Sequence, residues 1–265
     1  MRTSTAYRGP TSTSWAVARR ERTSWLRDDA STRRLLAACA RALSDGHLPL
    51  APKIGDATGR LVEGLCGHRP RALREAIDGP VRGRSRRTDR EVDAAVRRCL
   101  IDHVAGDGST LADSVIRRAA VRTLRRPILL IDAAEGSGVA DRLTPGERAA
   151  LADHVGMAYR GDVALVSDTV LWRLSGDLLG ESLGGAVLLV VAEPLCQEAP
   201  GVESLRRENE IRAHLDVLVA QGLQRLSRTP RSAHSPTRTG QASAALRGLV
   251  AALLSDMAAA AREVS

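Results

Sequence analysis

The sequence predicts a mainly α-helical protein: a single helical domain with a disordered N-terminal tail and a C-terminal tethered helix. The 265 residues include no Phe, two Tyr and three Trp, so Leu, Val and Ala must build most of the core. Leu and Ala are strong helix formers. Capping signals also precede stretches whose apolar residues recur every three or four positions. No stretch shows the strict alternation that is typical of a half-buried strand.

Changes in composition divide the chain into four segments. We expect a flexible basic tail over residues 1–30, a helical domain over 31–226, a linker over 227–241 and a C-terminal helix over 242–265. Thr, Ser, Gly and Pro dominate the start of the chain, and these residues favour turns over helix. The linker "SRTPRSAHSPTRTGQ" is basic and has the composition of a flexible connector.

The first helix of the domain is predicted to begin at Ser31 with "STRRLLAACARAL". Gly and Pro residues should stop it, namely Gly46, Pro49 and Pro52. Shorter helical pieces follow around 57–66 and 70–78. A basic loop, "GPVRGRSRR", then occupies residues 79–87.

Two capping boxes predict the next two helices. In each box the Thr hydroxyl accepts the amide of the third helical residue, whose acidic side chain reaches back to the Thr amide. Thr88 and Glu91 form the first box, and Thr110 and Asp113 form the second. The sequence "AGDG" separates the two helices, and Pro127 ends or kinks the second one.

A third helix start lies at "LTPGE", with Thr144 as cap and Pro145 at the first helical position. Helices are expected over about 145–158, 162–175 and 203–226. Apolar residues of the last helix recur on one face, at Ile211, Leu215, Leu218, Gly222 and Leu226.

The net charge is +8 and the isoelectric point about 10.4, and Lys53 is the only lysine. This excess allows weak, salt-sensitive binding to nucleic acid. Four cysteines stand apart among apolar neighbours and predict buried thiols of a cytoplasmic protein. The apolar run 183–192 is much shorter than a bilayer span, so we expect no membrane partner. The oligomeric state is left open.

One alternative function is a serine hydrolase. "GESLGG" at 180–185 matches Gly-x-Ser-x-Gly, in which Ser182 would attack an ester carbonyl. That motif requires a preceding strand and a histidine base, but helices are expected upstream. His214 falls in a predicted helix, and His234 falls in the linker. We therefore interpret the segment as a helix with close-packing glycines.

Three other patterns suggest a nucleotide, zinc or nucleic-acid site, but each lacks residues that such a site requires. "RPILLIDAAEG" ends near Asp132 like a nucleotide-binding strand, but no Gly-Lys-Ser or Gly-Lys-Thr accompanies it. Cys99 and His103 are four residues apart on one helix, but a structural zinc normally needs four ligands. The basic loop 82–90 has no aromatic residues for base stacking. The sequence predicts no catalytic residue, no cofactor site and no metal site.

Three segments resemble the QatB component of the Qat antiphage defence operons: "TSTAYRGP" near the start, "GDGSTLADSVIRRAAVRTL" at 106–124 and "LCQEAPGVESLRRENEIRAHL" at 195–215. These operons also encode an ATPase, a QueC-like enzyme and a TatD-like nuclease. The resemblance implies a bacterial, non-enzymatic scaffold or protein substrate. Its partners would be the QueC-like enzyme and the ATPase of the same operon.

The resemblance also implies a role for the start of the chain. The residues that a partner would recognise are Thr3, Ser4, Tyr7, Gly9 and Pro10. A QueC-like enzyme activates a carboxylate with ATP and can join it to an amine. The family usually has Gly directly after Met, whereas this chain has Arg2. We therefore expect recognition of the tail, and conjugation at the terminus stays open.

Overall fold

The computed structural model describes residues 12–28, 31–45, 50–66, 89–106, 108–125, 128, 165–198, 201–227 and 236–259. Within these ranges the chain forms eight helices and no strand, which confirms the mainly α-helical prediction. The helices are α1 (Thr13–Asp28), α2 (Thr32–Ser44), α3 (Leu50–Leu65), α5 (Asp89–Ala105), α6 (Leu111–Thr123), α9 (Asp168–Glu198), α10 (Val202–Ser227) and α11 (Pro236–Ala259).

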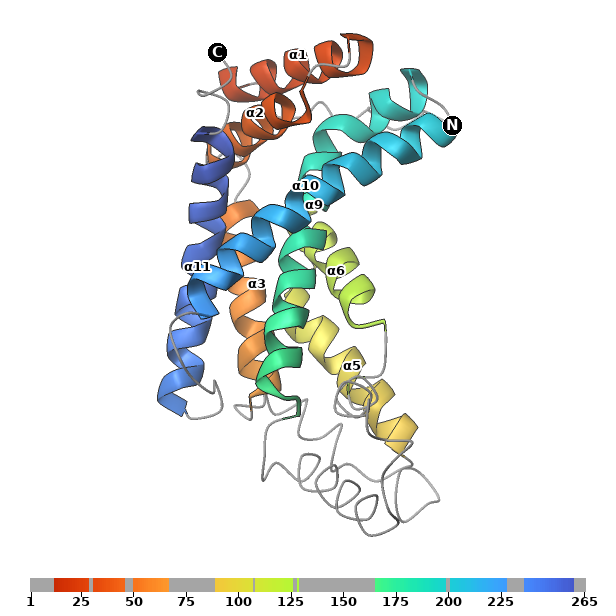
Figure 1. Ribbon diagram of the computed structural model, residues 1–265. Helices are drawn as coiled ribbons and strands as arrows, with labels where there is room; N and C mark the ends of the chain where they lie inside the picture. Colours follow the sequence, from red (N-terminus) through yellow and green to blue (C-terminus); the bar gives the residue numbers. More distant parts are fainter. Residues whose placement is uncertain are drawn as a thin grey trace, which may run out of the picture.

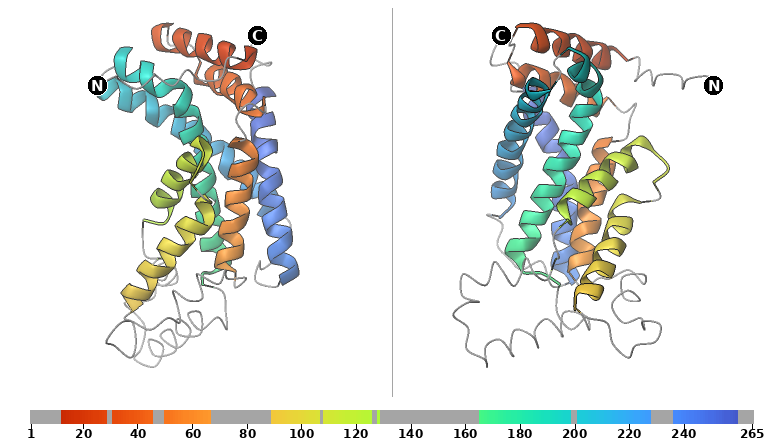
Figure 2. Two further views of the ribbon diagram at one scale, coloured as in Figure 1. Left: turned by 180° about the vertical axis from the view of Figure 1, so that it is seen from behind. Right: turned by 90° about the vertical axis from the view of Figure 1, so that its right-hand side faces the viewer.

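Helix α3 is the centre of the bundle (Figure 1). It packs against α5, α6, α9 and α11, and its buried side chains include Ile54, Leu61 and Leu65. Helices α1 and α2 lie across one end of the bundle, and α10 packs along α9 (Figures 1 and 2). The core is almost wholly aliphatic, as the composition predicts, with Trp25 as its largest fully buried side chain.

Helix α11 is an integral part of the bundle rather than a tethered helix. It begins at Pro236, inside the segment expected to be a linker, and packs closely on α3. The close approach depends on Gly55, where a Cβ would lie 3.0 Å from the Arg247 carbonyl oxygen. A Cβ at Gly59 would lie only 2.6 Å from Ser243 Oγ. The missing side chains at Gly55 and Gly59 let α11 approach α3 closely. Helix α11 therefore packs on the bundle, and the prediction of a separate C-terminal helix is wrong.

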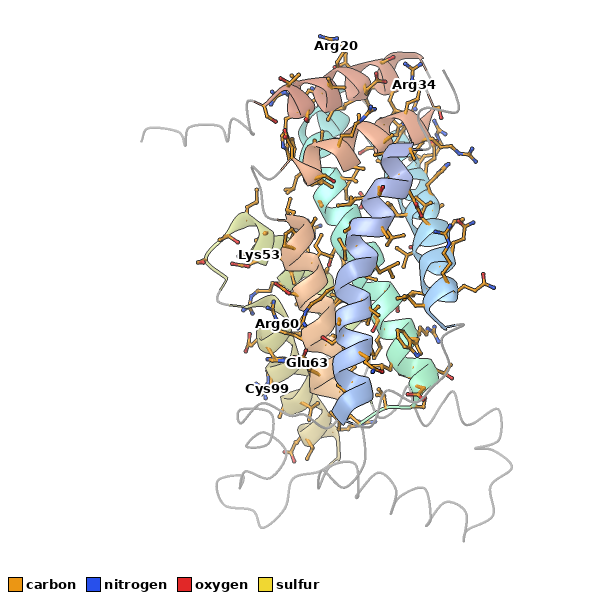
Figure 3. The ribbon with its side chains drawn as sticks, turned by 90° about the vertical axis from the view of Figure 1, so that its left-hand side faces the viewer. Arg20, Arg34, Lys53, Arg60, Glu63 and Cys99 are labelled. Atoms are coloured by element: carbon orange, nitrogen blue, oxygen red, sulfur yellow. The ribbon has the colours of Figure 1, made fainter. Side chains whose placement is uncertain are left out.

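Polar contacts reinforce the pairing of α3 with α11. Glu63 lies on α3 beside α11 (Figure 3). Its Oε1 accepts from the Ser243 hydroxyl over 2.7 Å and from Arg247 Nη2 over 3.0 Å. Ser243 is buried, so its hydroxyl requires such a partner.

The boundary of the N-terminal tail also differs from the prediction. Residues 13–28, which were expected to belong to a flexible tail, form α1 and pack against α2. Trp15 and Trp25 are buried in this contact. Two large aromatic surfaces removed from water stabilise a helix whose polar composition alone would not hold it.

Other helix boundaries show where local signals failed. Helix α3 starts at Leu50 and contains Pro52, which was expected to be a stop. In the first helical turn the missing N–H of proline costs nothing, because that position has no intrahelical acceptor. Helix α9 starts at Asp168 and continues to Glu198, well past the expected end at residue 175. The predicted helices over 70–78 and 145–158 lie outside the described residues.

The second capping box is confirmed. Thr110 Oγ1 accepts from the Asp113 amide over 3.2 Å, and Asp113 Oδ2 accepts from the Thr110 amide over 3.0 Å. Helix α5 ends at Ala105, followed by Gly106 with φ of 75°, where the "AGDG" break was expected. The caps at Thr88 and Thr144 lie outside the described residues.

Two stretches are long and apolar enough to cross a membrane, judged by length and composition only: Asp168–Val191 and Thr239–Ala259. This is weak evidence, because the core helix of a soluble protein meets the same criterion. Here α9 packs against α3, α6 and α10, and α11 packs against α2 and α3.

Candidate functional site at the junction of α1, α2 and α10

The predicted recognition residues Thr3, Ser4, Tyr7, Gly9 and Pro10 lie outside the described residues. The description starts at Ser12, whose carbonyl accepts the Ala16 amide as α1 begins. Helix α1 follows the recognition segment along the chain and contacts α2, α9 and α10.

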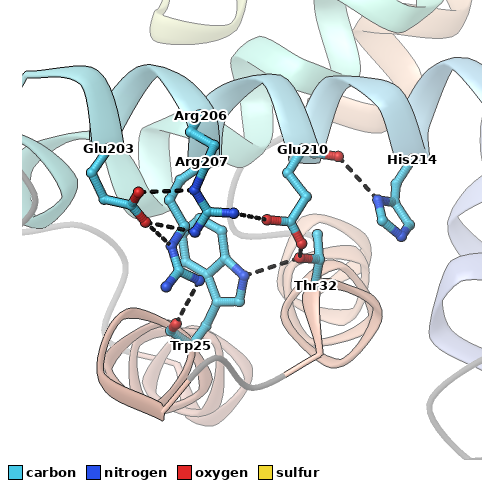
Figure 4. A network of polar contacts seen from close by, with 7 residues as sticks. All are labelled: Trp25, Thr32, Glu203, Arg206, Arg207, Glu210 and His214. Carbon is cyan, nitrogen blue, oxygen red and sulfur yellow. Dashed lines mark hydrogen bonds and ion pairs between the residues drawn. The ribbon is translucent and has the colours of Figure 1, made fainter.

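Trp25 is the centre of the junction that holds α1 (Figure 4). Its side chain is 1% exposed, and its indole Nε1 donates to Thr32 Oγ1 over 3.0 Å. The Thr32 hydroxyl in turn donates to the Glu210 carboxylate. This chain of hydrogen bonds joins α1 to α2 and α10, and it satisfies polar groups that are buried on folding.

Arg207 of α10 closes the junction from the other side. Its guanidinium carbon lies 5.0 Å from the centre of the Trp25 ring, which is within the range of a cation–π contact. Its Nη1 also donates to the Trp25 carbonyl oxygen over 3.1 Å. Arg207 is 7% exposed, so both contacts are shielded from water.

Glu203 balances the charge of this arginine. Arg207 Nε donates to Glu203 over 2.9 Å, and Arg206 donates to both Glu203 oxygens over 2.8 and 2.7 Å. The hydrogen bonds from Arg206 and then Arg207 lower the pKa of Glu203 to about 2. The Glu203 carboxylate is therefore ionised throughout the physiological pH range, and it orients Arg207 against the face of the Trp25 ring.

Further contacts tie α1 to the bundle. Arg22 Nη1 donates to the Val190 carbonyl oxygen of α9 over 3.1 Å. Arg34 of α2 lies 3.8 Å from Glu21, and Trp15 buries its ring near the start of the helix. The start of α1 is thus fixed relative to the bundle.

The sequence carries one local signal for this junction. Trp15, Ala18, Arg22 and Trp25 recur at helical spacing, which places two tryptophans on one face. Arg207 on α10 gave no comparable signal, because only the fold brings it to Trp25 across 182 positions of sequence.

The hydrolase motif does not form a nucleophile elbow. Ser182 lies within α9 and is fully buried, and its Oγ has no hydrogen-bond partner. An elbow requires an exposed hydroxyl on a strand-to-helix turn. His214 lies on α10, where its Nδ1 is 3.0 Å from the Glu210 carbonyl oxygen, and His234 lies outside the described residues.

Cys99 and His103 do not belong to a metal centre in the described part of the chain. Cys99 and His103 share α5, but no group of three or more His, Cys, Asp or Glu residues there could hold a metal ion. Burial lowers the pKa of His103, with the nearby Arg60 acting in the same direction. Asp132 and most of the basic loop 82–90 lie outside the described residues.

Comparison with protein-family models, curated proteins and solved structures finds no match to this chain.

Proposed function

We propose that this protein is a non-enzymatic antiphage defence component that resembles QatB and acts as a scaffold or protein substrate for its operon partners. A QueC-like enzyme would recognise residues 3–10. The observation that carries the proposal is the anchoring of α1 directly behind this segment. Trp25 donates to Thr32 and packs against Arg207, so residues 3–10 precede a helix that is anchored to the bundle.

A rigid support changes the energetics of tail recognition. A segment that orders on binding loses conformational entropy at that moment, which limits its affinity. Fixing its point of attachment reduces the freedom that remains to be lost. We therefore expect modest affinity for the isolated segment and tighter binding when α1 carries it.

The composition of the segment supports recognition over packing. "TSTAYRGP" contains one large side chain, Tyr7, among small polar residues. A tyrosine gives a large contact area with few rotatable bonds. Pro10 fixes its own backbone and restricts Gly9 before it, which favours one bend of the chain.

Copurification with an affinity-tagged QueC-like enzyme tests the proposal. We expect Tyr7→Ala to remove most of the bound protein and Tyr7→Phe to retain it, because the ring supplies most of the contact. Removing residues 260–265 serves as the control truncation at the opposite end. Equal copurification of all these variants would contradict recognition through the tail.

Conjugation can be tested separately, because Lys53 provides the only side-chain ammonium group. Protein coexpressed with the operon is digested, and any added mass is located by mass spectrometry. An adduct within residues 1–11 that persists in Lys53→Arg would show that Arg2 does not prevent modification. Unmodified protein that still copurifies would show recognition without conjugation.

A further inference from the structure

A groove lies between α6, α9 and α10, away from the α1 junction. Its lining includes Val115, Arg118, Arg122, Gly185, Leu188 and Leu189. Its volume is about 300 Å³. Arg122, Glu181 and Arg212 also line a larger, more polar hollow of about 600 Å³, so the two hollows adjoin.

One end of the groove is apolar and exposed. Leu189 of α9 is 39% exposed and is one of five large apolar residues in the described chain that are exposed. Val115 of α6 and Leu188 of α9 border it, and a Cβ at Gly185 would lie 3.0 Å from Val115 Cγ1. The two helices thus approach closely at Val115, which is buried, while the exposed Leu189 and the half-buried Leu188 leave apolar surface in the groove.

The rim of the groove carries net positive charge. Three arginines line it against one carboxylate, Glu181, which accepts from Arg122 over 3.1 Å and from Arg212 over 2.9 Å. Burial opposes ionisation of Glu181, but these two hydrogen bonds hold its pKa below the ordinary value. Arg118 is exposed and forms no ion pair with any of the described residues.

We propose that this groove binds an acidic amphipathic helix of a partner protein. Leu189 and Val115 would contact an apolar side chain of that helix, and Arg118 and Arg122 would pair with carboxylates beside it. An amphipathic helix in a groove combines these two contacts at spacings of three and four residues. Guanidinium groups favour carboxylates because their geometry allows paired hydrogen bonds.

The groove chemistry fits a nucleic acid less well. None of the described lining residues is aromatic, so bases would have no stacking platform. Glu181 would also repel a phosphate backbone. A nucleic acid would leave the apolar surface around Leu189 without a contact. The proposed site does not depend on residues 3–10.

Fluorescence anisotropy with a labelled helical peptide of Leu and Glu tests the proposal on the full chain. The same peptide with Gln in place of Glu and a scrambled peptide are the controls. We expect saturable binding of the Leu–Glu helix only. Arg118→Glu should weaken binding about tenfold, because it replaces an attraction by a like-charge contact. Leu189→Ala should weaken it several-fold by removing apolar contact.

The matched control is Arg20→Glu, which makes the same charge change on an exposed arginine of α1 (Figure 3). It should leave peptide binding unchanged, as should deletion of residues 2–10. Arg118→Gln provides a milder variant if charge reversal perturbs folding. Equal weakening by Arg20→Glu and Arg118→Glu would overturn the proposal. So would equal binding of the scrambled peptide, or an oligonucleotide that displaces the Leu–Glu helix and shows the same dependence on Arg118.

Discussion

Lys53 Nζ lies 2.6 Å from Asp113 Oδ1 and 2.9 Å from Thr110 Oγ1, so the only lysine of the chain joins α3 to the capping box of α6. Asp113 is 4% exposed. Its two oxygens therefore serve two structural tasks, since Oδ1 pairs with Lys53 while Oδ2 caps the helix.

Removing Lys53 should destabilise the protein more than removing an exposed cation. We expect Lys53→Met to lower the free energy of unfolding by about 1–3 kcal/mol, because a largely buried carboxylate loses its charged partner. The control is Arg117→Met, which breaks the exposed pair of Arg117 with Asp102 and should cost under about 1 kcal/mol. Urea denaturation measures both, and equal losses would contradict this role of Lys53.

The α1 anchor predicts a large effect at Trp25. Trp25→Ala should cost about 3–5 kcal/mol, because it leaves a cavity and separates Arg207 from its ring. Val202→Ala on α10 is the control and should change stability by under about 0.5 kcal/mol, since Val202 is 83% exposed. Thermal denaturation followed by circular dichroism gives both values. A Trp25→Ala melt that matches that of the native chain would show that α1 is not anchored.

Burial raises the pKa of the Cys39 and Cys66 thiols from 9.0 to about 12, with Asp168 adding to the shift at Cys66. In the folded protein both should resist iodoacetamide at pH 8, whereas the half-buried Cys99 should react before either of them. Peptide mass spectrometry measures the order. Early modification of Cys39 would contradict its burial.

The same shifts predict a loss of stability at alkaline pH. Well below pH 9 both thiols are neutral in the folded and unfolded chains, and their contribution is fully present. Between pH 9 and about 12 only the unfolded thiols ionise, so the free energy of unfolding should fall. Cys39→Ser with Cys66→Ser should flatten this part of the pH profile.

The net charge of +8 predicts weak binding to nucleic acid without sequence preference. Affinity should fall steeply between about 50 and 200 mM salt, because it rests on release of counterions. Filter binding with two unrelated oligonucleotides measures both properties. Tight binding that persists at physiological salt would favour a nucleic-acid function over the defence scaffold.

The sequence predicts the features of the fold that depend on residues close together in the chain. The cap at Thr110, the aliphatic core and the helix after Gly201 all follow from patterns within one or two turns, and the structure has them. The mainly helical fold could therefore be derived without any distant contact.

The sequence does not predict the helix contacts that depend on residues far apart in the chain. The anchoring of α1 needs Arg207 beneath Trp25, and the packing of α11 needs Gly55 and Gly59 opposite Ser243 and Arg247. The sequence predicts flexible ends because their local composition is polar or interrupted by proline. The groove beside Arg118 likewise exists only once α6, α9 and α10 are packed.

Deletion of residues 2–10 tests the central claim most directly. The deleted protein should keep its melting temperature, because the described contacts of α1 involve residues from Ser12 onward. Cells that carry the otherwise intact operon should lose phage protection in a plaque assay, while the variant lacking residues 260–265 should protect fully. Full protection by a folded protein without residues 2–10 would contradict recognition through "TSTAYRGP".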